Sequence, residues 1–167
     1  MDKKVIIIIS LLTVLVLGGG VMIMGGQTQK ASVEKTSGAK IQTFESSFDF
    51  KDVKYSEGNV KHEFKIKNNG TKDLTVANMA TSCMCTKVYL QVGDNKSPEF
   101  GMKGHSSSSA WKGVLKAGEE GQIIAVFDPT AHGPAGVGPI SRIVSFETND
   151  PDKPYVEFAF SGNVVKD

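Results

Sequence analysis

The sequence predicts an all-β domain, an antiparallel β-sandwich of about seven strands, preceded by one N-terminal transmembrane or signal helix. Three observations predict this. The chain begins with a long uncharged hydrophobic run, the remainder contains short segments that alternate apolar and polar residues, and turn-forming residues separate those segments. Alternation is typical of half-buried strands, and many short strands with frequent turns are typical of a sandwich.

The N-terminal segment, residues 5–24, contains no charged residue and is expected to be a transmembrane signal anchor. A helix of about 20 residues covers roughly 30 Å, the thickness of the hydrocarbon core of a bilayer. Lys3 and Lys4 precede the segment, which favours a cytoplasmic tail over residues 1–4. The sequence therefore predicts a single-pass protein of the cell membrane with its domain on the periplasmic or extracellular side.

A cleaved signal peptide is the alternative for the same segment. Residues 5–17 have the length of a signal-peptide hydrophobic region, and Gly18 could begin a cleavage region. Hydrophobicity resumes at residues 21–24 and no Ala-x-Ala site follows, which favours the uncleaved anchor. Cleavage would make the protein secreted, and both interpretations place the domain outside the cytoplasm.

Residues 25–40 are expected to form a flexible stalk, because they are rich in small and polar residues and contain one valine and no aromatic residue. The globular domain is expected over residues 41–167, with an inserted loop at 93–113 that is polar and contains a run of four serines. The predicted strands cover residues 48–53, 60–67, 74–79, 87–92, 122–127, 140–147 and 155–164.

Composition argues against several functions. The 19 Lys plus Arg and 18 Asp plus Glu nearly cancel, and Arg142 is the single arginine, so no basic field for nucleic acid is expected. No serine or cysteine elbow accompanies the histidines, and no Gly-rich phosphate loop opens a helix. His62 falls on the apolar face of its strand and is expected to be half-buried, whereas His105 and His132 lie in loops. An enzyme is not expected.

Cys83 and Cys85 are the only cysteines. In a strand, residues i and i+2 face the same side with Cα atoms about 6.6 Å apart, at the upper limit of disulfide geometry. A bulge or turn at Met84 would change this spacing. Three states stay open, namely a strained Cys83–Cys85 disulfide, two free thiols, and a soft-metal chelate.

A copper or zinc site is the metal hypothesis. Thiolates and thioethers select Cu(I) and zinc. The candidate ligands are Cys83, Cys85, Met84 between them, and Met102 and His105 in the insert. The spacing is not that of a zinc finger and no second cysteine pair exists, so the alternative is a pair of small, partly buried cysteines with no cofactor.

A series of short motifs follows the predicted strands and turns in order. They are Phe48-Asp49-Phe50-Lys51, Asn68-Asn69-Gly70, Ser82-Cys83-Met84-Cys85-Thr86, Lys116-Ala117-Gly118-Glu119, Thr148-Asn149-Asp150-Pro151 and Ser161-Gly162. In this order they resemble a bacterial family of exported domains known only as domain of unknown function number fifteen seventy-three. Lys51 and Met84 stand where that family usually has Gly, and Ala117 stands where it has Pro. The resemblance covers roughly residues 44–165 and implies an exported, immunoglobulin-like sandwich related to Hydin-type domains, with a binding or scaffolding role.

These observations predict a non-enzymatic extracytoplasmic binding or scaffolding module that is anchored at the membrane. Its expected partner is an envelope protein, contacted through a strand edge or the 93–113 insert, and not a nucleic acid. The alternative is a copper- or zinc-binding or thiol-redox protein that uses the Cys83-Met84-Cys85 run.

Overall fold

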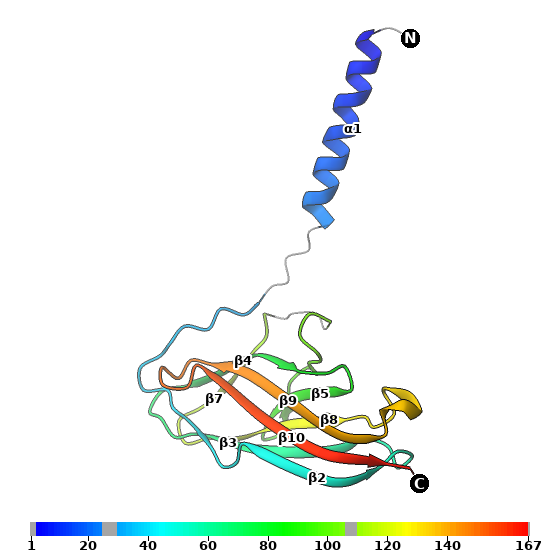
Figure 1. Cartoon of the computed structure of the whole chain (residues 1–167). Coiled ribbons are helices and arrows are strands. Elements are labelled where there is room, and N and C mark those ends of the chain that lie inside the picture. Colours follow the sequence, from blue (N-terminus) through cyan, green and yellow to red (C-terminus); the bar gives the residue numbers. More distant parts are fainter. Residues whose placement is uncertain (1–2, 25–29, 106–109, 167) are drawn as a thin grey trace.

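The computed structural model describes residues 3–24, 30–105 and 110–166 (Figure 1). Its globular part is a sandwich of two five-stranded sheets. One sheet has the order β1 (Ile41–Thr43), β3 (Val60–Asn68), β8 (Glu120–Phe127), β5 (Thr86–Val92) and β6 (Asn95–Lys96). The other has the order β2 (Ser47–Lys54), β10 (Tyr155–Val165), β9 (Gly138–Thr148), β4 (Leu74–Thr81) and β7 (Lys112–Leu115). The all-β sandwich is confirmed.

The described residues form ten strands rather than about seven. The seven predicted strands correspond to β2, β3, β4, β5, β8, β9 and β10. The additional strands, β1, β6 and β7, have three, two and four residues, which is too short for alternation to be recognised. The strand pairs are antiparallel except β2 and β10, which run parallel.

The core lies between the two sheets, where the alternating strands bury one face each. Phe64 of β3 stacks on Phe158 of β10 with ring centroids 4.6 Å apart, and both side chains are almost completely buried. Burying a side chain of this size contributes about 1.5–3 kcal/mol. These aromatic contacts hold the two sheets face to face.

Helix α1 spans Lys3–Met24. Across the described parts of the chain, no helix is both long enough and apolar enough to cross a membrane. The membrane anchor expected over residues 5–24 stays a prediction.

Residues 30–40, which were expected to belong to a flexible stalk, instead pack along the sandwich (Figure 1). Ala31 exchanges two hydrogen bonds with the Asn78 side chain, at 3.0 and 2.9 Å, and the Thr36 amide donates to the Asn149 carbonyl at 2.8 Å. Backbone hydrogen bonds to asparagines therefore hold this polar segment, which composition alone does not reveal. Residues 25–29 of the predicted stalk lie outside the described residues.

The 93–113 insert is also more structured than a loop. Phe100 exchanges backbone hydrogen bonds with Val88 of β5 at 2.8 and 2.9 Å, and its ring lies 5.5 Å from that of Trp111. These two aromatic residues pack against the core, so part of the insert extends the sandwich. Residues 106–109, the serine run, lie outside the described residues.

Lys51 has a φ of 60°, in the left-handed region that glycine adopts at no steric cost. This is one of the two positions at which the resembled family usually has Gly. The structure thus gives a backbone reason for that glycine, and Lys51 adopts the same conformation with Asp49 accepting its amide hydrogen bond at 2.9 Å.

Candidate thiol and metal site

Cys83 and Cys85 lie in the turn that connects β4 with β5. Because these strands belong to different sheets, the turn crosses from one sheet to the other. The Thr86 amide donates to the Cys83 carbonyl at 3.2 Å, which closes the turn. Met84 stands at its tip and is 59% exposed. The prediction that the two cysteines lie side by side on a flat strand is wrong. A turn at Met84 places them instead.

The turn is held by the hydroxyl residues on either side of it. The buried Thr81 hydroxyl lies 2.9 Å from the Cys83 carbonyl and 3.1 Å from the Thr86 carbonyl. The Ser82 hydroxyl accepts the Ile143 amide hydrogen bond at 2.9 Å, and the Ser82 amide donates back to the Ile143 carbonyl. The residues that flank the cysteines therefore fix the position of the turn on β9.

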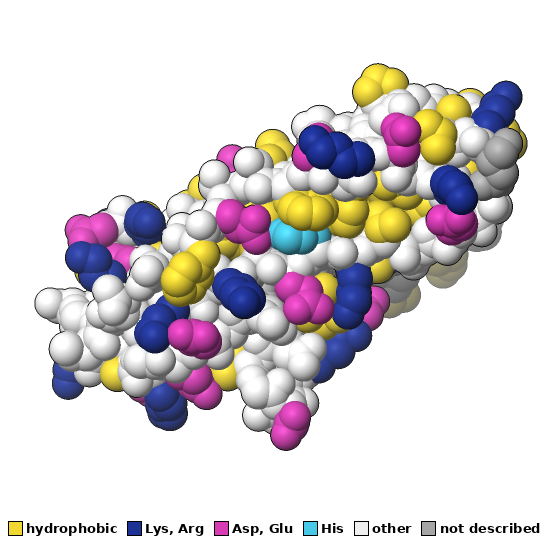
Figure 2. Space-filling view, turned by 90° about the horizontal axis from the view of Figure 1, so that it is seen from below, with side chains coloured by type: hydrophobic (Ala, Val, Ile, Leu, Met, Phe, Trp, Pro, Cys, Tyr) yellow, Lys and Arg dark blue, Asp and Glu magenta, His cyan; other side chains and the backbone are white. Residues whose placement is uncertain are grey.

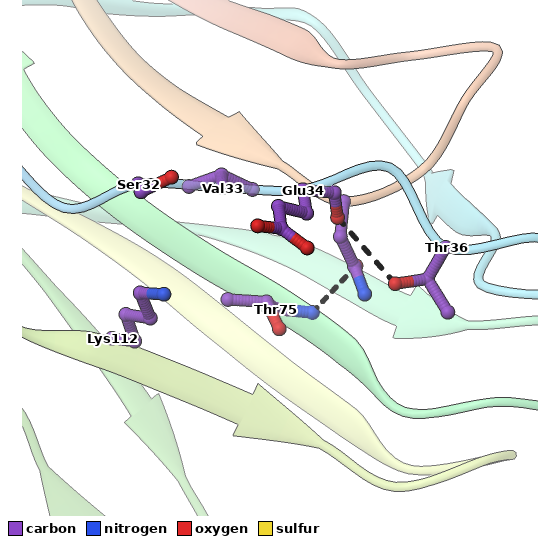
Figure 3. A pocket seen from close by; sticks show the side chains of 7 residues that line it. Ser32, Val33, Glu34, Thr36, Thr75 and Lys112 are labelled. Carbon is purple, nitrogen blue, oxygen red and sulfur yellow. Dashed lines mark hydrogen bonds between the residues drawn. The ribbon is translucent and has the colours of Figure 1, made fainter.

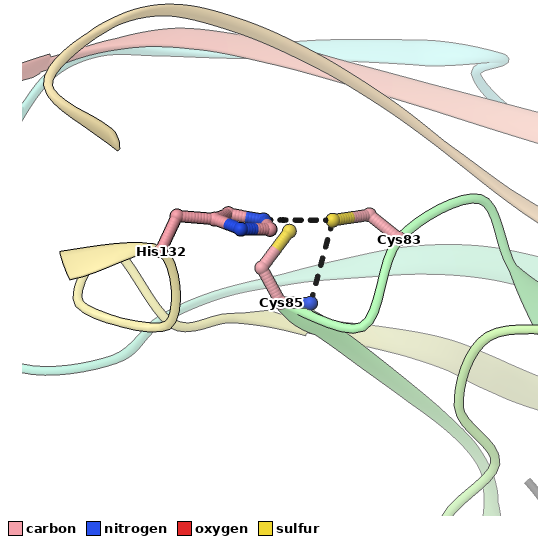
Figure 4. Close-up of side chains that lie close together, drawn as sticks. All are labelled: Cys83, Cys85 and His132. Atoms are coloured by element: carbon pink, nitrogen blue, oxygen red, sulfur yellow. Dashed lines mark hydrogen bonds between the residues drawn. The ribbon is translucent and has the colours of Figure 1, made fainter. Parts of the chain in front are cut away.

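A second crossing connection, between β8 and β9, meets this turn. The Asp128 amide donates to the Cys85 carbonyl at 2.9 Å, which ties the two connections together. His132 lies in the second connection, just before the 3₁₀ helix η1 (Gly133–Gly136). In Figure 4 the side chains of Cys83, Cys85 and His132 point toward one another.

These three residues form a cluster that we call the thiol–imidazole cluster. The Cys83 sulfur lies 3.1 Å from His132 Nε2 and accepts the Cys85 backbone amide at 3.4 Å (Figure 4). The two sulfurs and one ring nitrogen all lie within 4.8 Å of one another. Both cysteines are free thiols in this structure.

Arg142 of β9 contacts the cluster at Cys85. Its Nε donates to the Cys85 sulfur at 3.1 Å, and its Nη1 donates to the Ser141 carbonyl at 2.8 Å. The single arginine of the chain is therefore placed against the buried thiol.

The two thiols have opposite pKa shifts. At Cys83, burial would raise the pKa, but hydrogen bonds from the Cys85 thiol, the Cys85 amide and His132, with the charge of Arg142, lower it to about 7. At Cys85, burial and the hydrogen bond to Cys83 raise the pKa, against the opposing effect of Arg142. Because the thiolate is the nucleophile and the metal ligand, Cys83 is the reactive member of the pair.

Two of the five predicted site residues, Cys83 and Cys85, belong to this cluster. Cys83 and Cys85 are brought together, whereas His105 is exposed in a separate turn where its amide donates to the Met102 carbonyl at 3.0 Å. Met102 forms an isolated bridge with Thr81. His132 and Arg142 were not among the predicted site residues, because the β8–β9 connection and strand β9 meet the cysteine turn only in the folded chain, which leaves no spacing signal.

His62 is half-buried, as expected. It stacks on Phe48 with ring centroids 3.6 Å apart, and its Nε2 lies 2.8 Å from a Glu45 carboxylate oxygen. The imidazole therefore has an aromatic and a polar partner within the sandwich. On the face shown in Figure 2, lysines and acidic residues are interspersed around a strip of hydrophobic side chains.

Two grooves mark the surface of the sandwich. One, of about 380 Å³, lies between residues 32–36 and the β4–β7 edge, and Glu34, Thr36, Thr75 and Lys112 make its lining polar (Figure 3). The other, of about 340 Å³, lies where the edges of the two sheets meet. Its apolar lining is Leu90, Val92, Trp111 and Val114.

Comparison with known proteins agrees with this fold. Residues 41–97, about a third of the chain, match a family described as "Protein of unknown function (DUF1573)", so the resemblance is confirmed over that segment. No curated protein matches the chain.

The fold is similar to that of one solved structure in particular, and two further structures align less well. A protein of unknown function from Porphyromonas gingivalis W83 is 15% identical, with a TM-score of 0.57 over 80% of this chain and 49% of that one. This chain thus spans about half the length of that protein. PapD-like domain 7 of human CEP192 is 16% identical, with a TM-score of 0.48 over 83% of this chain and 94% of that one. The class 5 fimbriae chaperone CfaA is 11% identical, with a TM-score of 0.42 over 77% and 57%.

Proposed function

We propose that this chain is a non-enzymatic binding or scaffolding module that stands outside the cytoplasm and is attached to the membrane through residues 5–24. The uncharged run at these residues, with Lys3 and Lys4 before it, supports the location. The observation that carries the binding role is the groove at the edge of the sandwich, where apolar side chains lie beside polar and charged ones. Its lining is Leu90, Val92, Trp111, Gly113 and Val114 with Asn95, Lys96, Ser97, Lys116 and Glu119.

That groove adjoins two strand edges. β6 and β7 are the last strands of their sheets among the described residues, so each sheet ends beside it. Val114 of β7 is 45% exposed, and Leu90 packs so closely on the Gly113 backbone that a Cβ there would lie 2.5 Å from it. A sheet edge beside apolar pockets suits an extended segment of another protein, because backbone bonds give affinity and pockets give specificity. The expected partner is an envelope protein.

The test is capture of partners from solubilised membranes with the full chain as bait, beside a Val114→Asp variant. We expect one or more envelope proteins to be retained by the wild type and lost from the variant. Tyr155→Asp, another exposed apolar position, is the matched control and should retain them. Recovery of the same proteins with Val114→Asp, or of none with the wild type, would contradict the proposal.

Membrane attachment has its own test. Deletion of residues 5–24, with an unrelated cleavable signal in their place, should move the protein from the membrane fraction to the soluble extracytoplasmic fraction. An unmodified chain that is itself recovered in the soluble fraction, shortened at its N-terminus, would support the cleaved signal peptide instead.

The second candidate function is copper or zinc binding, or thiol redox chemistry, at Cys83 and Cys85. The close approach of Cys83, Cys85 and His132 favours it. Anaerobic purification followed by metal analysis and reversible thiol titration, beside a Cys83→Ser, Cys85→Ser double variant, is the test. Negligible metal in both proteins, with no reversible thiol oxidation, would exclude this function.

A further inference from the structure

We propose that Cys83, Cys85 and His132 form a three-coordinate site for Cu(I), in which Arg142 supplies the counter-charge that favours Cu(I) over zinc. This inference rests on the second candidate function and adds to it a third ligand, a metal and a basis for selectivity.

The ligand set follows from the geometry of the thiol–imidazole cluster. Two thiol sulfurs and one imidazole nitrogen lie within 4.8 Å of one another, on two connections that the Asp128–Cys85 hydrogen bond holds together. A metal ion placed among them would reach all three atoms after small side-chain rotations. Sulfur and imidazole donors are those that Cu(I) and zinc prefer.

The net charge of the occupied site differs between these two metals. Two thiolates and Cu(I) carry a net charge of −1, which Arg142, 3.1 Å from the Cys85 sulfur, brings to zero. With Zn²⁺ the same ligands are neutral, and Arg142 leaves an uncompensated charge of +1. Arg142 is half-buried and its Nε faces the buried Cys85 sulfur, so solvent screens such an excess charge only in part.

Coordination number gives the same preference. Structural zinc is usually held by four protein ligands in a tetrahedron. Within the described residues, the cluster contains three Cys, His, Asp or Glu ligands, and the Arg142 guanidinium, which cannot ligate a metal, faces the Cys85 sulfur. Three donors complete a trigonal Cu(I) site, whereas zinc would need a water molecule as its fourth ligand.

The cluster is also open to exchange. His132 is exposed and Cys83 is partly exposed, whereas Cys85 is buried. Cu(I) can therefore enter from the side of His132 and Cys83. Binding displaces the proton of each thiol that still carries one, and the copper keeps its oxidation state, so no electron acceptor is required.

The first experiment titrates the full chain in detergent, without oxygen, with Cu(I) in competition with bathocuproine disulfonate. We expect one Cu(I) per chain, and X-ray absorption with two sulfur neighbours and one nitrogen neighbour. His132→Ala should weaken binding by at least about 100-fold, since loss of an outer-shell partner alone costs 10–100-fold. His105→Ala is the matched control, because His105 is an exposed loop histidine outside the cluster, and it should bind as the wild type does.

The second experiment tests the counter-charge. Arg142→Met keeps an apolar stem and removes the charge, so the ratio of Cu(I) affinity to zinc affinity should fall by about 10-fold or more. An unchanged ratio would overturn the role of Arg142, and equal Cu(I) affinity of His132→Ala and wild type would overturn the ligand set.

The outcomes also separate this inference from the candidate function on which it rests. A wild-type chain that binds zinc but not Cu(I), or that binds no metal but oxidises reversibly at Cys83 and Cys85, overturns the copper site and leaves the second candidate function standing. A chain that does none of these contradicts both.

Discussion

Two polar motifs of this sandwich are used in different ways. Residues 148–150 form a buried corner: the Asp150 side chain accepts hydrogen bonds from the Ile41 and Asp152 amides at 2.8 and 2.9 Å, and the Asn149 side chain accepts the Thr75 amide at 2.7 Å. In the thiol–imidazole cluster, by contrast, Cys83 and Cys85 interact with each other, and the third member, His132, is exposed.

The difference indicates how structural and functional polar groups can be told apart. The corner satisfies backbone amides from distant parts of the chain, so its loss would leave buried donors unpaired. The cluster satisfies few backbone groups, since hydroxyls of Thr81 and Ser82 position its turn. We therefore expect the corner to carry stability and the cluster to carry chemistry.

The largest expected loss of stability follows from a substitution in the buried corner. Asp150 is 1% exposed, and Asp150→Ala should lower the free energy of unfolding by about 3 kcal/mol, because the amides of Ile41 and Asp152 lose a charged acceptor. Denaturant unfolding of the full chain measures this. Asp152→Ala, at an exposed neighbouring position, is the control, and equal losses in the two variants would contradict the assignment.

A smaller loss of stability is expected when the hydroxyl that supports the turn of the cluster is removed. Thr81→Val removes the hydroxyl that contacts the Cys83 and Thr86 carbonyls, and should cost about 1–2 kcal/mol. Because the turn then loses its fixed position, the variant should also bind Cu(I) more weakly. A loss of stability with unchanged Cu(I) affinity would show that Thr81 does not position the cysteines.

The smallest effect on stability is expected within the cluster itself. His132→Ala should change the free energy of unfolding by no more than about 0.5 kcal/mol, as for most exposed positions. A loss of several kcal/mol would mean that His132 is structural and would remove the distinction between the two motifs.

The same variant should change the reactivity of Cys83. In the metal-free wild type, alkylation of Cys83 should rise with pH and reach half its maximal rate near pH 7, since the pKa lies near 7 and only the thiolate reacts. His132→Ala removes one of the hydrogen bonds that lower this pKa, so the midpoint should move to higher pH. Peptide mass spectrometry after timed alkylation separates Cys83 from Cys85, which should react more slowly because burial raises its pKa.

The sequence was sufficient for the long strands and insufficient for the site. Val60, Phe64 and Ile66 alternate clearly along β3, and the wider pattern predicts the sandwich because burial on one face repeats every second residue. The asparagine contacts of residues 30–40 could not be predicted, since Asn78 and Asn149 hold that segment through its backbone.

The cysteines were found as a pair, but their partners were not. His132 is 47 residues beyond Cys85 and approaches it because two connections cross between the sheets beside each other. Arg142 is 57 residues beyond Cys85 and approaches it from β9, to which Ser82 holds the turn. That proximity is a property of the topology. Met84, by contrast, is between the cysteines in sequence and yet directs most of its side chain to solvent.

The most direct test of the thiol–imidazole cluster as a copper site is the thermal unfolding of the full chain with and without Cu(I), beside the Cys83→Ser, Cys85→Ser double variant. A ligand that binds the folded state stabilises it in proportion to the logarithm of its concentration over its Kd, by about 2.7 kcal/mol at a hundredfold excess over Kd. We predict that Cu(I) raises the unfolding midpoint of the wild type and leaves that of the double variant unchanged. An equal shift in both proteins, or none in the wild type, would contradict the account.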